Sequence, residues 1–267
     1  MNGFLFTDKL SDIDLDLNEL SQLEAERQAR RLIMIPSESI APKAVRQLLG
    51  SPFVNLYAEG YPRAETRTQT QAEILDLPTQ LGYYRRYGDL RYYKGVDYVN
   101  VVEALARRRA AELFAANTLA PEDLWVNVQP LSGAAANNAV YTALIKPGDT
   151  ILGMNLLHGG HLTHGSPVNR SGMWYNALHY TVDPETECLD YDQIAKIAEE
   201  NHPKVIIAGY SSYPWIPDWN KFKQIAESVG AYLFADVSHI AGFIAAGLCP
   251  SPVGIADVIS FTTHKTL

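Results

Sequence analysis

The sequence predicts an α/β fold with a mainly parallel or mixed sheet, and two observations carry this prediction. Short apolar runs recur beyond Leu124, and segments with helical spacing separate them. Continuous apolar strands are covered on both faces, and strands that alternate with helices pair in parallel through right-handed crossovers. With 267 residues and 47% hydrophobic content, the chain can bury the core of one large α/β domain or two small ones.

The expected elements follow in chain order. A helix is predicted over residues 21–32, where Ser21 and Glu24 form a capping box and Pro36 closes the run. Residues 63–90 fit neither period and are expected to form a long surface excursion. The predicted strands are 124–128, 150–154, 204–209, 231–236 and 257–262, with helices at 133–145, 191–201 and 218–230. Ligands of such a sheet bind at the carboxyl ends of its strands.

Composition argues against several classes of partner. A formal charge of −8 gives no reason to expect nucleic acid or an anionic membrane surface. Cys188 and Cys249 are far apart and form no CxxC pattern, so a disulfide framework and a thiolate zinc site are not expected, and a cytoplasmic location is. The acidic N-terminus does not resemble a secretory signal, and no apolar run approaches the roughly 18 residues of a membrane span.

Two reactive side chains follow predicted strands near the end of the sequence. Asp236 ends the run AYLFAD, with His239 three residues later, and Lys265 follows Thr262 and His264 after the run DVISFT. A carboxylate at a buried strand end is costly unless it meets a cation or several donors, and the protonated pyridine ring of pyridoxal 5′-phosphate (PLP) is such a cation. A lysine that forms a Schiff base must present a neutral amine, which partial desolvation favours. The alternatives are an ion-paired structural aspartate and a solvated lysine.

Small residues lead from the predicted strand 124–128 into a helix. Ser132, Gly133 and Ala134 would expose backbone N–H groups at the positive end of that helix, where a phosphate can bind. A plain strand-to-helix turn is the alternative.

Three histidines, His158, His161 and His164, follow one another at intervals of three residues. No carboxylate or thiolate accompanies them in a regular helix, and Gly159 and Gly160 indicate a loop. We therefore expect no metal here, and we interpret an imidazole at this place as a ring stacked on an aromatic cofactor.

Six segments resemble the serine hydroxymethyltransferase family, from about residue 30 to the end of the sequence. They are YAEGYP (57–62), RYYKG (91–95), NVQPLSGAAANNAVYTAL (127–144), GDTILGMNLLHGGHLTHGSPVN (148–169), ADVSHIAG (235–242) and TTHKTL (262–267). The histidine–glycine string and THKTL are highly specific for this family among PLP enzymes. The resemblance implies the large domain of the PLP-dependent aminotransferase-like fold (fold type I), incomplete at its C-terminus.

The resemblance also implies a PLP site. Lys265 would be the Schiff-base lysine, Asp236 the partner of the pyridine nitrogen, and His161 the ring stacked on PLP. The remaining implied cofactor contacts are Ser132, Gly133 and Ala134 at the phosphate, Ser211 and His239 near the phenolic oxygen, and Thr262 and His264 around the lysine.

The implied reaction is the reversible transfer of the serine hydroxymethyl carbon to tetrahydrofolate, which gives glycine and 5,10-methylenetetrahydrofolate. Glu59 would be the carboxylate that handles protons in this reaction. The implied catalytic residues are Lys265, Glu59, His161, Asp236, Tyr93 and Thr262, and the implied substrate contacts are Ser37, Tyr57, Glu59, Tyr93, Leu156 and Leu162, the two leucines beside the folate pteridine. In the family several N-terminal groups serve the partner subunit's site, so a homodimer with shared active sites is expected.

The sequence departs from the family pattern in three places. Residues 63–90 intervene between YAEGYP and RYY, where the family has only a couple of residues, and they could cover the substrate mouth. Ala134 replaces a serine, and the sequence stops at Leu267, so we expect the C-terminal small domain and its carboxylate-binding arginine to be absent. The expected organisation is an N-terminal arm and active-site segment (1–62), an insertion (63–90) and a truncated PLP-binding large domain (91–267).

Two other hypotheses stay open at this point. A lid formed by residues 63–90 could exclude folate and leave a folate-independent aldol cleavage of β-hydroxy amino acids. Alternatively, the 267-residue chain is an inert fragment or an assembly module, because the bidentate grip of the missing arginine is hard to replace.

Overall fold

The computed structural model describes residues 8–115 and 119–267, and the chain divides into two compact units, Met1–Glu38 and Ser39–Leu267. In the first unit, α2 (Leu10–Ile13) precedes α3 (Leu15–Arg30). The predicted start of this helix at Ser21 is wrong, because Asp14 caps it, accepting a hydrogen bond from the Leu17 amide at 3.0 Å. Glu24 does not serve a cap and instead pairs with Arg27 at 2.7 Å within the helix.

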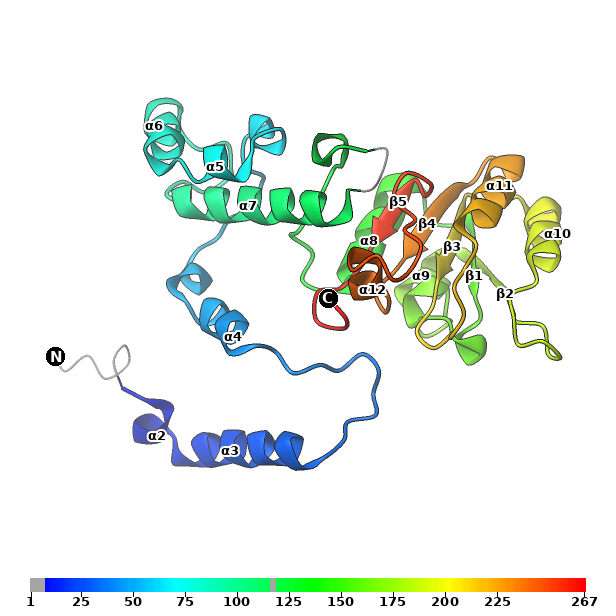
Figure 1. Cartoon of the computed structure of the whole chain (residues 1–267), viewed down its shortest axis with the longest axis horizontal. Coiled ribbons are helices and arrows are strands. Elements are labelled where there is room, and N and C mark those ends of the chain that lie inside the picture. The colour runs from blue at the N-terminus through cyan, green and yellow to red at the C-terminus, as the bar shows by residue number, and fades with distance from the viewer. Residues whose placement is uncertain (1–7, 116–118) are drawn as a thin grey trace. The chain divides into compact units, whose positions relative to one another are not determined.

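A parallel sheet of five strands, in the order β2-β1-β3-β4-β5, forms the centre of the second unit among the described residues (Figure 1). The strands are β1 (Thr150–Met154), β2 (Asn176–Tyr180), β3 (Val205–Gly209), β4 (Tyr232–Asp236) and β5 (Val258–Ser260). The predicted α/β class with a parallel sheet is confirmed, and four of the predicted strands form β1, β3, β4 and β5.

The second unit also contains the helices described here. They are α4 (Lys43–Leu49), α5 (Gln71–Ile74), α6 (Leu77–Tyr87), α7 (Asp97–Phe114), α8 (Gly133–Leu144), α9 (Arg170–Trp174), α10 (Tyr191–Asn201), α11 (Trp219–Val229) and α12 (Ala241–Ala245). The helices α8, α10 and α11 match the predicted ones, and each begins at a side-chain cap, Ser132, Asp190 or Asp218.

Alternate residues of each strand supply two apolar cores, one on each face of the sheet. On one face Leu152, Ile206 and Leu233 pack with residues of α10, α11 and α12. On the other face Ile151 and Phe234 join a cluster with residues of α8. Burial on both faces explains why the inner strands β1, β3 and β4 are mostly apolar, as parallel strands between helix layers are.

Two expectations about strands are wrong. Residues 124–128 pair with no strand of the described chain; Trp125 is 79% exposed, and Asn127 folds back to accept a hydrogen bond from the Gln129 amide at 2.9 Å. The edge strand β2 is absent from the predicted set because its sequence, NALHY, is partly polar and only its last residue is buried.

Residues 63–90 are largely helical, although their sequence predicted no helix. Caps at Thr70 and Asp76 start α5 and α6, and both helices pack on α7. Ile74 of α5 is fully buried beside Val101 and Ala104 of α7. The segment therefore has a core of its own with α7.

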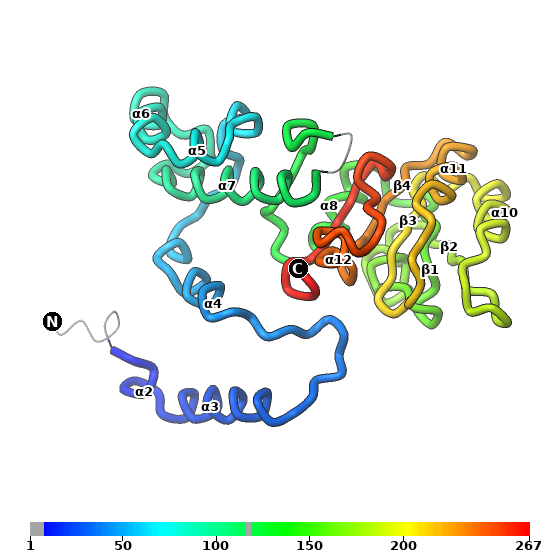
Figure 2. The backbone as a smooth tube through the Cα atoms, in the orientation of Figure 1, coloured from blue at the N-terminus to red at the C-terminus, as the bar shows by residue number. Residues whose placement is uncertain are grey.

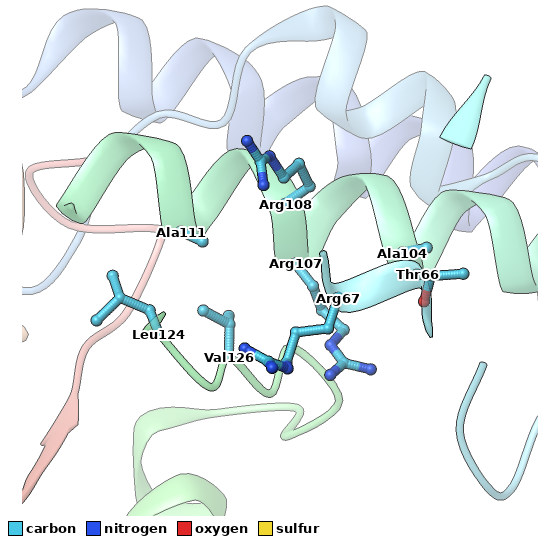
Figure 3. Close-up of a pocket in the computed structure, with 8 residues that line it drawn as sticks. All are labelled: Thr66, Arg67, Ala104, Arg107, Arg108, Ala111, Leu124 and Val126. Atoms are coloured by element: carbon cyan, nitrogen blue, oxygen red, sulfur yellow. The ribbon is translucent and has the colours of Figure 1, made fainter. Parts of the chain in front are cut away.

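A small cavity of about 10 Å³ remains between this segment, α7 and residues 124–126 (Figure 3). Arg67, Arg107 and Arg108 are among its lining residues. Arg108 is neutralised by Glu112 and Glu122, and the space is about that of one water molecule.

The C-terminal residues run back beside α12 (Figure 2), where Gly242 donates its amide hydrogen to Thr266 Oγ1 at 3.1 Å. Among residues 8–115 and 119–267, no helix has the length and apolar character needed to cross a membrane.

Candidate functional site

The site lies at the carboxyl ends of the central strands, where parallel α/β sheets bind their ligands. The strand β4 ends at Asp236, β5 ends at Ser260, and the loop after β1 contains His161 and His164. Hydrogen bonds join these strand ends to the first turns of α8.

Asp236 is a buried carboxylate surrounded by donors. It is 8% exposed and accepts hydrogen bonds from Asn137 Nδ2 at 2.8 Å, from His164 Nε2 at 3.0 Å, and from the amide and hydroxyl of Ser238 at 3.1 and 2.6 Å. Burial raises the pKa of Asp236, but the hydrogen bond and charge of His164, with those from Ser238 and Asn137, outweigh burial and hold the pKa well below its ordinary value. The group is a carboxylate at neutral pH.

Asn137 connects four elements. Its Nδ2 donates to Asp236 at the end of β4 and to Thr163 Oγ1, each at 2.8 Å, and its Oδ1 accepts from Ser260 Oγ at 2.7 Å. We call Asp236, Asn137, Thr163, His164 and Ser238 the Asp236 cluster. Of these five residues, only Asp236 was predicted from the sequence as a site residue, and His164 was one of three regularly spaced histidines. The only signal for Asn137, Thr163 and Ser238 was their place in the segments that resemble the family.

His161 projects from the loop between two 3-10 turns, Leu156–His158 and Leu162–His164. Gly160 is required before it, because a Cβ atom there would overlap the carbonyl oxygen of Met154 at the end of β1. The His161 ring lies 5.5 Å from the His164 ring, centroid to centroid. Burial, reinforced by the positive charge of His164, lowers the pKa of His161 to about 4, so the imidazole is neutral at physiological pH.

His161, His164 and Asp236 each place a nitrogen or oxygen atom within 4.8 Å of the others, close enough to hold a metal ion. Both carboxylate oxygens of Asp236 already accept two hydrogen bonds each, and His164 Nε2 is one of the donors. The arrangement therefore suits a hydrogen-bonded carboxylate, and the expectation of no resident metal stays a prediction.

Lys265 lies on the segment after β5 and is half-buried. Burial lowers the pKa of Lys265, while the charge of Asp236 raises it in part. Burial is the largest cause that lowers the pKa values of His161 and His239, and the charge of Lys265 lowers both values further. The charge of Asp236 therefore acts on the Lys265 amine, and the charge of that amine acts on the two imidazoles.

The turn at Ser132, Gly133 and Ala134 is packed against the segment that carries Lys265. Ser132 caps α8 by accepting a hydrogen bond from the Ala135 amide at 3.2 Å. A Cβ atom at Gly133 would lie 2.8 Å from Thr262 Cγ2, so this close approach needs glycine. The hydroxyl oxygen of Thr262 is buried and has no hydrogen-bond partner in the part of the chain that the structure describes.

The other expected cofactor and folate contacts lie around this centre. Ser211 follows β3 and donates its amide hydrogen to Gly159 at 2.6 Å, and the His239 carbonyl accepts from Thr266 Oγ1 at 3.3 Å. His264 is exposed. Leu156 and Leu162 are each 43% exposed on the two 3-10 turns that flank His161.

Tyr57, Glu59 and Tyr93 form a separate, exposed group. The rings of Tyr57 and Tyr93 lie 5.4 Å apart, and the Tyr92 amide donates to the Glu59 carbonyl at 3.1 Å, which brings the two ends of residues 63–90 together. No hydrogen bond, ion pair or ring contact among the described residues joins this group to the Asp236 cluster. Ser37 lies in a turn of the first unit.

Arg91, which the sequence analysis did not select, holds the backbone on both sides of Glu59. Its guanidinium is 1% exposed, pairs with Glu103 at 2.6 Å, and donates to the carbonyl oxygens of Ala58 and Gly60. Breaking such a buried pair would leave an uncompensated charge, so this anchor is rigid.

The parallel sheet between helix layers, with a buried carboxylate, an imidazole and a half-buried lysine at its carboxyl ends, defines an α/β domain of fold type I. The family model described as serine hydroxymethyltransferase matches residues 10–87 and 69–267. The chain therefore belongs to the serine hydroxymethyltransferase family. The two matches overlap at residues 69–87.

Two curated relatives are similar over nearly all of the chain. The serine hydroxymethyltransferase of Methylococcus capsulatus is 47% identical over 259 residues, which cover 97% of this chain and 54% of that protein. The serine hydroxymethyltransferase of Prochlorococcus marinus is 49% identical over 254 residues, which cover 95% of this chain and 54% of that protein. The chain spans about half the length of the curated relatives it matches.

Proposed function

We propose that the whole protein uses PLP to transfer the hydroxymethyl carbon of serine to tetrahydrofolate, with glycine and 5,10-methylenetetrahydrofolate as products. Family membership supports this reaction, and one structural observation carries it. Asp236 is held as a buried carboxylate by four hydrogen bonds beside His161 and within the electrostatic reach of Lys265.

The residues present fit the cofactor. A carboxylate with a lowered pKa keeps the pyridine nitrogen protonated, which makes the ring an acceptor of electrons from the substrate carbon. The first amides of α8, after Ser132, suit a phosphate, and the buried, unpartnered hydroxyl of Thr262 offers a further polar contact. In this proposal Ser211 and His239 lie at the phenolic oxygen, and His264 lies beside the lysine.

Lys265 is the proposed point of covalent attachment. A lowered pKa increases the fraction of neutral amine, which is the nucleophilic form. The neutral imidazole of His161 can cover a flat ring without adding a positive charge next to it. Thr262 completes the lysine's surroundings.

Proton transfer to and from the substrate hydroxyl is assigned to Glu59, with Tyr57 and Tyr93 beside it. Because these three side chains are exposed and make no described contact with the Asp236 cluster, we propose that they complete the site of a partner subunit in a homodimer. We propose that Ser37 likewise binds the substrate carboxylate in the site of the partner subunit. The bidentate arginine for that carboxylate belongs, in this proposal, to the other half of the protein.

We also propose the domain organisation expected from the sequence, with an arm and active-site segment at 1–62, an insertion at 63–90 and the PLP-binding domain from 91 onward. The insertion does not need to close the site, since its buried residue Ile74 attaches it to α7.

Folate dependence tests the proposed reaction. The full-length protein, loaded with PLP, is given serine with and without tetrahydrofolate, and glycine formation is measured. We expect turnover to require tetrahydrofolate; equal turnover without it would overturn the proposal in favour of folate-independent aldol cleavage.

Two leucines offer a matched pair of variants for the folate site. Leu162→Ala should raise the KM for tetrahydrofolate several-fold, because this half-exposed side chain is assigned to the pteridine. Leu157→Ala, at a side chain that is 91% exposed, should leave the KM unchanged. Equal effects of the two substitutions would remove Leu162 from the folate site.

A further inference from the structure

A continuous chain of hydrogen bonds joins Asp236 to His161. Asn137 Nδ2 lies 2.8 Å from Asp236 Oδ2 and 2.8 Å from Thr163 Oγ1, and Thr163 Oγ1 lies 2.7 Å from His161 Nδ1. The two intermediate side chains, Asn137 and Thr163, are each 1% exposed, so water does not compete for these groups. The Thr163 carbonyl is held as well, because it accepts from the hydroxyl of Tyr141 at 2.7 Å.

The charge of Asp236 sets the direction of the hydrogen bonds that the Asn137 amide makes. A carboxylate only accepts hydrogen bonds, so the amide NH₂ of Asn137 must face it, and the donation from Ser260 Oγ to Asn137 Oδ1 at 2.7 Å agrees with that orientation. The same NH₂ group donates to Thr163 Oγ1. The hydroxyl hydrogen of Thr163 is then free to point at His161.

His161 Nδ1 is consequently an acceptor. The backbone amide of Thr163 also points at this nitrogen, at 3.2 Å, and an N–H cannot donate to a protonated nitrogen. The single proton of the neutral ring therefore lies on Nε2. The titratable groups that act on His161 are His164, Asp236, Lys265 and His239, and burial with their combined effect lowers the pKa of the ring so that it is neutral.

We propose that Thr163 is a positioning residue that locks His161 in the Nε2–H tautomer, so that this imidazole presents a hydrogen-bond donor to the cofactor pocket and has no nitrogen free to act as a base. The inference rests on the proposed function, because it concerns the ring assigned to stack on PLP. It deepens that function by leaving proton abstraction to another group, such as Glu59.

Three forms of the full-length protein test this inference: the wild type, Thr163→Val, which has the same shape without the hydroxyl, and Thr163→Ser, which keeps it. Selective ¹⁵N-histidine labelling and solid-state NMR report the tautomer, and His161→Gln identifies the signal. We expect an unprotonated Nδ1 and a protonated Nε2 in the wild type and in Thr163→Ser. Thr163→Val should show a mixture of tautomers.

The pH titration of the same signal gives a second readout. The Thr163 hydroxyl stabilises the neutral ring, so its loss in Thr163→Val should raise the pKa of His161 by about one unit, and Thr163→Ser should restore the wild-type titration. A wild-type ring protonated at Nδ1, or identical tautomers and titrations in Thr163→Val and the wild type, would overturn the inference.

These measurements separate the inference from the proposed function. They are made on the cofactor-free protein and repeated with PLP, so the tautomer is observed whether or not the enzyme turns over. A wild type that does not bind PLP would refute the proposed function, while an Nε2–H tautomer in the same sample would still support the role of Thr163. If Thr163→Val does not fold, the wild type and Thr163→Ser still decide the tautomer.

Discussion

At the scale of single residues, the central feature is a negative charge kept inside the fold. Burial alone would make the Asp236 carboxylate neutral, and the four donors from Asn137, His164 and Ser238 reverse that preference. Since the folded-state pKa of Asp236 is depressed, its contribution to stability is present above the ordinary pKa of an aspartate and is lost as the pH falls through the folded value.

Asp236→Asn tests the electrostatic coupling between the carboxylate and the lysine. Asp236 raises the pKa of Lys265, so its removal should lower that pKa further, as measured by the pH dependence of Lys265 acylation in the cofactor-free full-length protein. The loss of the pyridine partner should reduce kcat on the order of a hundredfold or more.

Asp257→Asn is the matched control for this substitution, because Asp257 pairs with Lys223 at 2.8 Å away from the cluster. It should change neither the pKa of Lys265 nor kcat. An Asp236→Asn protein with an unchanged or higher Lys265 pKa would contradict the electrostatic account.

Residue chemistry was partly predictable from the sequence. Asp236 and Lys265 could be considered because a carboxylate and an amine after buried strands are chemically conspicuous, whereas His161 was distinguished from His158 and His164 only by the family resemblance. Asn137 and Thr163 are ordinary residues for a helix and a turn, and their importance depends on contacts across 99 and 26 residues of sequence. No local pattern reports such contacts.

At the scale of elements, α7 supports both residues 63–90 and the segment that contains Glu59. Glu103 on α7 pairs with Arg91, which holds the carbonyls around Glu59, and Ala104 on α7 contacts Ile74. Residues 63–90 are therefore expected to stabilise α7.

Ile74→Ala should remove about 2–5 kcal/mol of stability from this packing, because it leaves a cavity beside α7. Hydrogen exchange in the full-length protein should show faster exchange of the α5 and α7 amides. Leu75→Ala, at a neighbouring side chain that is 49% exposed, should leave the exchange unchanged. Equal exchange in the wild type and Ile74→Ala would show that the insertion is not packed as described.

Elements were predictable where both faces are buried. The strands β1, β3 and β4 are mostly apolar and were recognised, whereas the half-exposed edge strand β2 was not. Residues 124–128 have strand-like composition, but composition does not reveal whether a neighbouring strand is available, and none pairs with them in the described chain. The helix α5 has only four residues, too few for a periodic signal, and α6 begins at the Asp76 cap with a polar, aromatic and basic sequence that fits no helical period.

At the scale of the whole molecule, the proposed homodimer with shared sites makes a quantitative prediction. Glu59→Gln and Lys265→Arg subunits should each be inactive as homodimers. Equal mixing by co-expression should restore about a quarter of wild-type activity, because half of the dimers are then mixed and each mixed dimer has one complete site. A mixture as inactive as its parents would place Glu59 and Lys265 of one site on the same subunit.

In the proposed function, PLP is attached to Lys265 beside the Asp236 cluster. Borohydride reduction of the PLP-loaded full-length protein, followed by proteolysis and mass spectrometry, tests it most directly. We predict a phosphopyridoxyl group on the peptide that contains Lys265, absent from the Lys265→Arg variant. A label on another lysine, or no label on any peptide, would contradict the account.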